Sequence, residues 1–482
     1  MKKIILKSLL STMAFMALIG CEQELEPYDS KSSSAALATP EDLQIATYGT
    51  YAGLVDAEYT RVHHFMLNYP GDNVSLSGTT SDALYNVYNY THFPTMYTSE
   101  HFWRQAYKTI FSANEIITRI EDGESSELDQ LKGENLFVRA LAHFDLVRFF
   151  GRPYPQGDGN NPGIIIEDGT SEEEFPSRSS VAEVYDFVIA DLLKAADLMS
   201  VDKSASFATK EAAYALLSRV YLYKEENEKA IEYATMVINS GRYNLLPTDQ
   251  YREYFTLPPG SNAETIFAFH HTLADNRDKG AIGSMYYNNP ETGSSGWGEM
   301  FASTEYAKLL SPEDARNSFI EVQISAGDTL ERNGVPRIYV NKYNWQEGVV
   351  NLSSPVYLRL AEMYLNRAEA NAKLGNFEAA IEDVNTIRKR ANLSGDALYS
   401  VDNLMGHESV LDVVLEERRL ELAFEGHRPQ DLYRNMRTMT RAYPGFHGDD
   451  LFHQDIPADH PRVIFYIPER EVIVNPNLTQ NP

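Results

Sequence analysis

The stretch VLDVVLEERRLELAFEGHRPQDLYRNM, residues 410–436, contains the pattern around which the rest of the chain is organised. Its apolar residues recur at spacings of three, four and seven, which predicts a helix with one face in a core. Gly426 is expected to end this helix, because glycine takes the left-handed conformation at little cost. A second helical segment is expected to begin after Pro429.

The same stretch is dense in charged residues, which allow two interpretations. They could form exposed pairs worth a few tenths of a kcal/mol each. However, Leu420, Ala423 and Phe424 make the opposite face apolar as well. A helix that is apolar on most sides is buried, and its charges must then pair. We therefore expect a buried structural charge network of Glu417, Arg418, Glu421, Glu425, Arg428 and Asp431.

The letters ERRLELAFEGHRPQDL, residues 417–432, resemble the signature of the RagB/SusD family of outer-membrane nutrient-binding lipoproteins. Two other blocks resemble the same family: residues 134–153, around FVRALAHFDLVRFFGRP, and the C-terminal IPEREVIVNPNLTQNP. The resemblance extends over essentially the whole chain. It implies a mostly α-helical, SusD-like fold in which the late helix is structural.

The composition excludes one class of partner. The 482 residues carry a formal net charge of −27 and 11% aromatic residues, chiefly tyrosine and phenylalanine. Such an acidic surface repels phosphates, so no nucleic acid partner is expected. It also disfavours highly sulfated polymers.

The first twenty residues are expected to be a lipoprotein signal peptide. Lys2, Lys3 and Lys7 precede an apolar run that is too short to span a membrane. The run ends in Leu-Ile-Gly-Cys, which resembles a bacterial lipobox. Cys21 is the only cysteine and has no disulfide partner in the chain, so we expect it to be lipidated, for example with palmitate. An ordinary secretion signal with an incidental cysteine is the alternative.

Residues 21–38 are acidic and then rich in serine and alanine, which predicts a flexible tether. Its early glutamates resemble the export signal of surface lipoproteins, and this resemblance implies a protein on the cell-surface side of the outer membrane. We expect an N-terminal SusD-like helical part over residues 39–250 and a C-terminal RagB/SusD part over 251–482.

Two segments show the spacing of a tetratricopeptide helix pair. They lie at residues 208–239 and around 364–387, about 150 residues apart, so no regular solenoid is expected. The segment between them, roughly residues 251–351, lacks the helical spacing and has a different composition. It begins with an alternating strand pattern at 263–269 and continues as a loop rich in glycine, asparagine and aromatics. Residues 463–467 are predicted to form a last short strand.

No catalytic motif, cofactor motif or metal-binding motif is present. The chain has no His-Glu-x-x-His, no cysteine pair and no phosphate loop before a helix. His447, His453 and His460 lie among aspartates, but their irregular spacing in a loop does not predict a metal site. We therefore expect no catalytic residue, no cofactor and no metal.

Aromatic-rich loops are the strongest signal for a ligand. Sugars present apolar C–H faces to rings and hydroxyls to amides and carboxylates. The family resemblance points to an N-terminal loop and to the central insertion as the regions that touch ligand. The candidate ligand-binding residues are Trp297, Tyr286, Tyr287, Tyr88, Tyr90, Phe93, Asp72 and Asn73. The alternative for each aromatic residue is that it anchors its loop to the scaffold.

The resemblance implies a non-catalytic surface lipoprotein that captures oligosaccharides or polysaccharides for a SusC-like TonB-dependent transporter. Three alternatives stay open: capture of peptides or other nutrients, glycoside hydrolysis by two carboxylic acids, and a structural repeat protein that docks another polypeptide.

Overall fold

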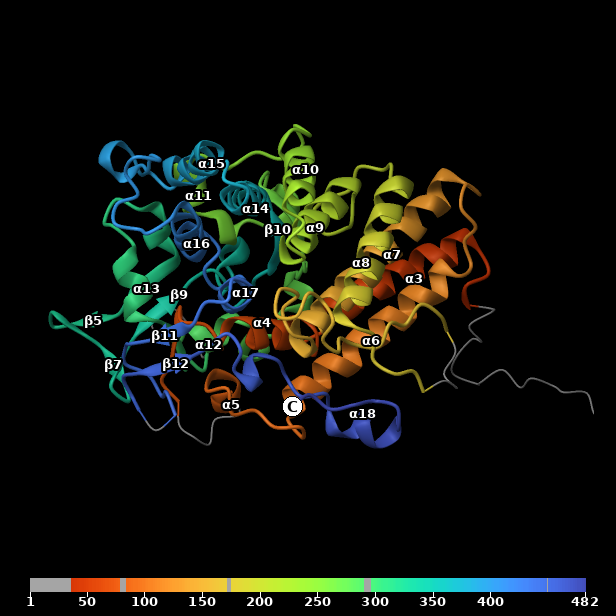
Figure 1. Cartoon of the computed structure of the whole chain (residues 1–482), viewed down its shortest axis with the longest axis horizontal. Helices are drawn as coiled ribbons and strands as arrows, with labels where there is room; N and C mark the ends of the chain where they lie inside the picture. Colours follow the sequence, from red (N-terminus) through yellow and green to blue (C-terminus); the bar gives the residue numbers. More distant parts are fainter. Residues whose placement is uncertain (1–35, 79–83, 171–174, 290–295, 449) are drawn as a thin grey trace, which may run out of the picture. The chain divides into compact units, whose positions relative to one another are not determined.

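Helices form most of the chain in this computed structural model, which describes residues 36–78, 84–170, 175–289, 296–448 and 450–482 (Figure 1). The α-helices there are α3 (Pro40–Val55), α4 (Thr60–Asn68), α5 (Tyr85–Tyr88), α6 (Tyr97–Ile117), α7 (Ser126–Phe150), α8 (Val181–Leu198), α9 (Lys210–Tyr223), α10 (Asn227–Ile238), α11 (Thr248–Tyr251), α12 (Gly283–Tyr286), α13 (Thr304–Leu309), α14 (Leu360–Lys373), α15 (Phe377–Arg390), α16 (Val410–Glu421), α17 (Arg428–Arg434) and α18 (Glu469–Val474). The expected mostly α-helical fold is confirmed. None of these helices is long and apolar enough to cross a membrane.

The strands of the described residues form short antiparallel pairs. They are β1 (Val74–Leu76) with β3 (Met300–Ala302), β2 (Thr265–Ala268) with β10 (Val356–Arg359), β4 (Ile320–Val322) with β9 (Ile338–Val340), β5 (Ile324–Ser325) with β6 (Asp328–Thr329), β7 (Glu331–Arg332) with β8 (Val335–Pro336), and β11 (Met439–Arg441) with β12 (Gln454–Ile456). Most of them lie in the central insertion, and β2 confirms the strand expected near residues 263–269.

Polar residues at the helix starts fix where several helices begin. Ser180 accepts from the backbone N–H of Glu183, and the Glu183 carboxylate accepts from the backbone N–H of Ser180, so a reciprocal capping box opens α8. Ser125 caps α7 and Thr209 caps α9 through a single bond each: the side-chain oxygen accepts from a backbone N–H of the first turn.

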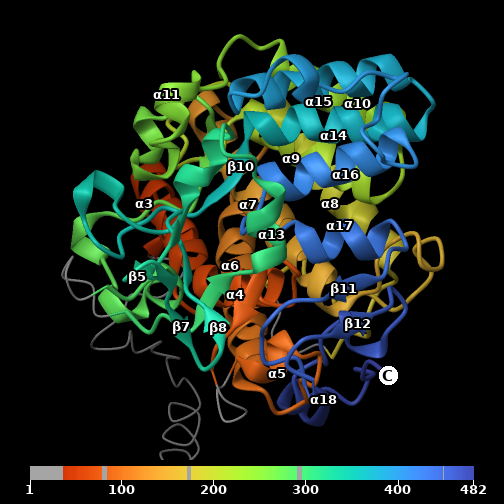
Figure 2. The same ribbon diagram turned by 90° about the vertical axis from the view of Figure 1, so that its left-hand side faces the viewer.

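The two tetratricopeptide-like helix pairs pack directly together, although a long insertion separates them in sequence. They are α9 with α10 and α14 with α15, and α10 lies against α14 (Figure 2). A buried ion pair joins them: Arg219 Nε and Nη2 donate to the two carboxylate oxygens of Glu362 at 2.6 and 2.7 Å. Contacts group residues 46–482 into one compact unit, to which this packing belongs.

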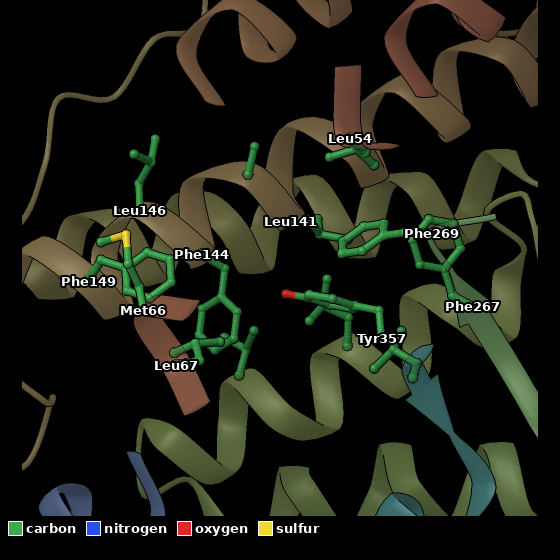
Figure 3. Close-up of a cluster of buried hydrophobic side chains, with 14 of the residues drawn as sticks. Leu54, Met66, Leu67, Leu141, Phe144, Leu146, Phe149, Phe267, Phe269 and Tyr357 are labelled. Carbon is green, nitrogen blue, oxygen red and sulfur yellow. The ribbon is translucent and has the colours of Figure 1, made fainter. Parts of the chain in front are cut away.

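The core of this unit is rich in aromatic rings. The rings of Phe267 of β2, the adjoining Phe269 and Tyr357 of β10 contact one another and belong to the same buried cluster as Leu141 and Phe144 of α7 (Figure 3). The hydroxyl of Tyr357 donates to Asp145 Oδ1 at 2.8 Å, so even this polar atom is satisfied inside the core.

Two expectations about element boundaries are wrong. The late helix ends at Glu421 rather than at Gly426. The carbonyl oxygen of Glu421, which would continue the helix, instead accepts from Arg359 Nη2 at 2.8 Å and Lys342 Nζ at 3.2 Å. A turn follows in which Phe424 and Gly426 both have positive φ, so Gly426 does adopt the left-handed conformation.

Residues 463–467 do not form the predicted strand. The N–H of Phe465 donates to the carbonyl of Phe149 at the end of α7, at 2.8 Å. The carbonyl of Phe465 accepts from the Asn481 side chain at 2.6 Å. Because its polar backbone groups are satisfied in these ways, the segment stays extended without a partner strand.

Candidate ligand-binding groove

A hollow of about 500 Å³ opens beside Trp297, and we call it the Trp297 groove. It is lined by residues of α4 and of the turn before it, by Leu84, by the start of α6, by Met285 of α12, and by Trp297 and Glu299 just before β3. Its lining residues are Ala57, Glu58, Arg61, Val62, Phe65, Leu84, Tyr97, Thr98, His101, Met285, Trp297 and Glu299. Apolar surface with a few polar groups is typical of ligand sites.

The Trp297 side chain has the features of a stacking platform. About half of its surface is exposed, at 49%, while its indole N–H donates to the Lys279 carbonyl at 3.2 Å. The backbone around it is held firmly: Trp297 N–H donates to the Ser284 carbonyl, and Arg332 Nη1 donates to the Trp297 carbonyl at 2.8 Å. The ring is therefore presented on a fixed backbone.

The glycines on either side of Trp297 have separate roles. A Cβ on Gly296 would lie 2.0 Å from the carbonyl oxygen of Tyr287, so only glycine fits this close approach. Gly298 has φ +53°, in the left-handed region that glycine tolerates best.

Tyr97 is a second exposed aromatic residue in the groove, and the sequence analysis missed it. It opens α6, is 49% exposed, and its ring lies 5.5 Å from that of His101. Phe93 lies four residues earlier and is 45% exposed, but it does not line the groove.

Tyr88 and Tyr90 are buried and anchor their loop. Arg441 is also buried, and its guanidinium carbon lies 4.0 Å from the centre of the Tyr88 ring. The hydroxyl of Tyr90 donates to the Pro70 carbonyl at 2.7 Å. In this structure neither ring offers a face to a ligand, which favours the anchoring alternative.

Tyr286 and Tyr287 are buried as well. The hydroxyl of Tyr286 lies 2.8 Å from His64 Nε2, and its ring is stacked on Tyr343. The ring of Tyr287 packs against Tyr339, with 4.9 Å between ring centres. Both tyrosines pack against other buried aromatic residues and do not line the groove.

Asp72 and Asn73 bind arginines and are not open to a ligand in this structure. Arg428 Nε and Nη2 donate to the two Asp72 oxygens at 2.8 and 2.9 Å. Burial alone would raise the pKa of Asp72, but Arg419 and Arg428 outweigh it and hold this pKa well below its usual value. Asn73 Oδ1 accepts from Arg419 Nε at 2.8 Å.

The charge network expected from residues 417–431 is buried and paired. Glu421 forms ion pairs with Arg359 and Arg390, and its other oxygen accepts from the Tyr251 hydroxyl at 3.0 Å. Arg418 binds Asp431, with 2.9 Å between Nε and Oδ2. The remaining members pair in the same way: Glu417 with Arg316 and Arg388, Glu425 with Lys342 and Arg359, and Arg428 with Asp72.

Within the described ranges, no group of three or more histidine, cysteine, aspartate or glutamate side chains is placed to hold a metal ion. Cys21, the expected lipidation site, lies outside the described residues.

Comparisons with known proteins agree with this fold. A family model described as starch-binding and associating with the outer membrane matches residues 24–222, and a SusD family model matches residues 322–482. A SusD superfamily structure from Bacteroides vulgatus is 30% identical with a TM-score of 0.80, covering 92% of this chain and 99% of that one. One from Bacteroides thetaiotaomicron is 28% identical with a TM-score of 0.82, covering 92% and 100%.

A SusD-like protein of Formosa agariphila, P38, is 27% identical, and the alignment covers 96% of both chains. The helical scaffold with its partly β insertion is thus the one that SusD superfamily proteins share. This chain belongs to the SusD family, whose members are nutrient-binding proteins associated with the outer membrane, and the resemblance drawn from its sequence is confirmed.

Proposed function

We propose that this protein is a non-catalytic, surface-facing lipoprotein of the outer membrane that captures oligosaccharides or polysaccharides in the Trp297 groove. It then delivers them to a SusC-like TonB-dependent transporter. The observation that carries the proposal is a groove of about 500 Å³ with two half-exposed aromatic rings, Trp297 and Tyr97. Membership of a family whose matching model is described as starch-binding supports the ligand class.

The carboxylates of the groove favour binding over hydrolysis. Glu58 accepts from Arg104 Nη2 at 2.6 Å, and Glu299 pairs with Arg332 at 3.1 Å. Both side chains are thus bound by guanidinium groups, whereas a glycosidase needs a pair of carboxyl groups that face the sugar.

Titration calorimetry with a panel of oligosaccharides, beside an assay for newly formed reducing ends, tests the function. Binding without turnover is expected. Turnover would favour the hydrolase alternative, and absence of binding to every glycan, with binding to peptides, would favour peptide capture.

Trp297→Ala is expected to weaken glycan binding about tenfold or more, equivalent to about 1.4 kcal/mol, because a stacking surface is removed. The melting temperature should stay near that of the parent, since the exposed ring contributes little to the core. Phe452→Ala is the matched control, because Phe452 is an exposed aromatic residue outside the groove. Unchanged affinity in a stably folded Trp297→Ala protein would remove the groove from consideration and direct attention to Phe93.

A further inference from the structure

The acidic side chains that line the Trp297 groove are paired with basic groups, but not every basic side chain near the groove is paired with an acid. Its two carboxylates already have cationic partners. Glu58 binds Arg104 and also lies 3.5 Å from His101 Nδ1, while Glu299 binds Arg332. The groove therefore has no carboxylate without a basic neighbour, as far as the described residues go.

Arg61 is in the opposite situation. Its guanidinium carbon lies 5.0 Å from the centre of the Phe65 ring, and it forms no ion pair with any residue that the structure describes. Its Nε is buried and has no hydrogen-bond partner there. Arg61 therefore brings to the groove wall a cation whose charge no described carboxylate neutralises.

Two further basic residues lie close by. Lys279 Nζ lies 5.4 Å from the centre of the Trp297 ring, and it too has no ion pair within the described chain. A smaller hollow adjoins the groove, since Arg61 lines both, and Arg277 is part of its wall. Arg277 donates to the Val55 carbonyl at 3.2 Å and to no described carboxylate.

We propose that the Trp297 groove selects glycans that contain uronic acid, with the sugar carboxylate bound by Arg61. This inference rests on the proposed function of the groove. The planar guanidinium fork matches the two oxygens of a carboxylate, and such charge-assisted bonds are about twice as strong as neutral ones. The chain as a whole repels anions, with a net charge of −27, so an acidic sugar needs a local cation that is not already neutralised.

The test compares acidic glycans with neutral forms of the same chains. Oligomers of polygalacturonate, alginate and glucuronoxylan are titrated into the parent protein beside their carboxyl-reduced counterparts. At least one acidic oligomer should bind ten times or more tighter than its reduced form. This preference should shrink as salt is raised, because ions screen the Arg61 contact.

Arg61→Gln should abolish that preference: the ratio between the affinities for the acidic oligomer and for its reduced form should fall from ten or more to about one, whatever the variant's affinity for the reduced form. Arg61→Lys should restore part of the preference. Arg437→Gln is the matched control, because it removes the same charge from an exposed position outside the groove. Melting temperatures establish that each variant is folded.

The outcomes separate this inference from the proposed function. If neutral glycans bind and no acidic oligomer is preferred, or if Arg61→Gln keeps the full preference, the selection of uronic acids is overturned while glycan capture stands. If no glycan of either kind binds, the proposed function itself fails. Trp297→Ala should weaken acidic and reduced forms alike.

Discussion

At the scale of single residues, burial decides what a charge contributes. Arg418 and Arg437 lie 19 positions apart in the chain, and each forms an ion pair with an aspartate. The side chain of Arg418 is fully buried against Asp431, whereas that of Arg437 is 44% exposed beside Asp412. An exposed ion pair contributes little because water solvates both partners, but a buried pair that loses one member leaves an uncompensated charge.

We therefore expect Arg418→Ala to lower the free energy of unfolding by about 3–5 kcal/mol and Arg437→Ala to lower it by less than about 1 kcal/mol. Urea denaturation of the two variants beside the parent measures both values. If both variants lose the same small free energy of unfolding, the Arg418 ion pair is exposed to water and is not buried.

At the scale of elements, the loop of Tyr88 and Tyr90 is held by the segment around β11. Arg441 of β11 donates to the Tyr88 carbonyl at 2.7 Å, and the hydroxyl of Tyr88 lies 3.0 Å from His447 Nδ1. The other ring nitrogen of His447 donates to the Tyr443 carbonyl at 2.8 Å. With Nε2 as the donor, a neutral His447 accepts from the Tyr88 hydroxyl through Nδ1. A protonated ring would make that hydroxyl the acceptor and turn its proton toward the Val74 carbonyl, at 3.5 Å.

Burial, assisted by the nearby Arg441 cation, lowers the pKa of His447 to about 4. An unfolded histidine has a pKa near 6.5, so between these two values the unfolded chain binds the proton and the folded chain does not. The free energy of unfolding should fall as the pH is lowered from 7 to 5. His447 contributes at most about 2 kcal/mol of that fall.

Denaturation at pH 7, 6 and 5 checks this prediction. His447→Gln, which keeps a donor and an acceptor, should show a weaker dependence on pH than the parent. His453→Gln serves as the control, since His453 is exposed. The same pH dependence in all three proteins would mean that His447 does not stay neutral in the fold.

At the scale of the whole molecule, the proposed anchor is a single residue. Cys21→Ala should release the protein from the membrane fraction into a soluble one, because lipid on Cys21 is the proposed attachment. Fractionation of cells that lack the transporter partner checks this, with Ser33→Ala in the tether as control. A Cys21→Ala protein that still sediments with the outer membrane of those cells would contradict lipidation as the anchor.

The sequence alone predicted the features that depend on local pattern. Periodicity predicted the late helix and the two repeated helix pairs. The apolar residues on both sides of α16 predicted that its charges are buried. The family resemblance was clearest in residues 417–432, where each charged side chain must pair with a buried partner and few other residues could replace it.

Only the tertiary structure decided which aromatic residues face outward and where the late helix stops. Tyr88, Tyr90 and Trp297 all lie in similar aromatic loops, yet Arg441 buries the first two while Trp297 is exposed. The end of α16 depends on Arg359 and Lys342, which are far away in sequence. Likewise, Arg61 stands out only because its neighbours' carboxylates are bound to other arginines. These outcomes depend on partners that folding brings together, and no local spacing encodes them.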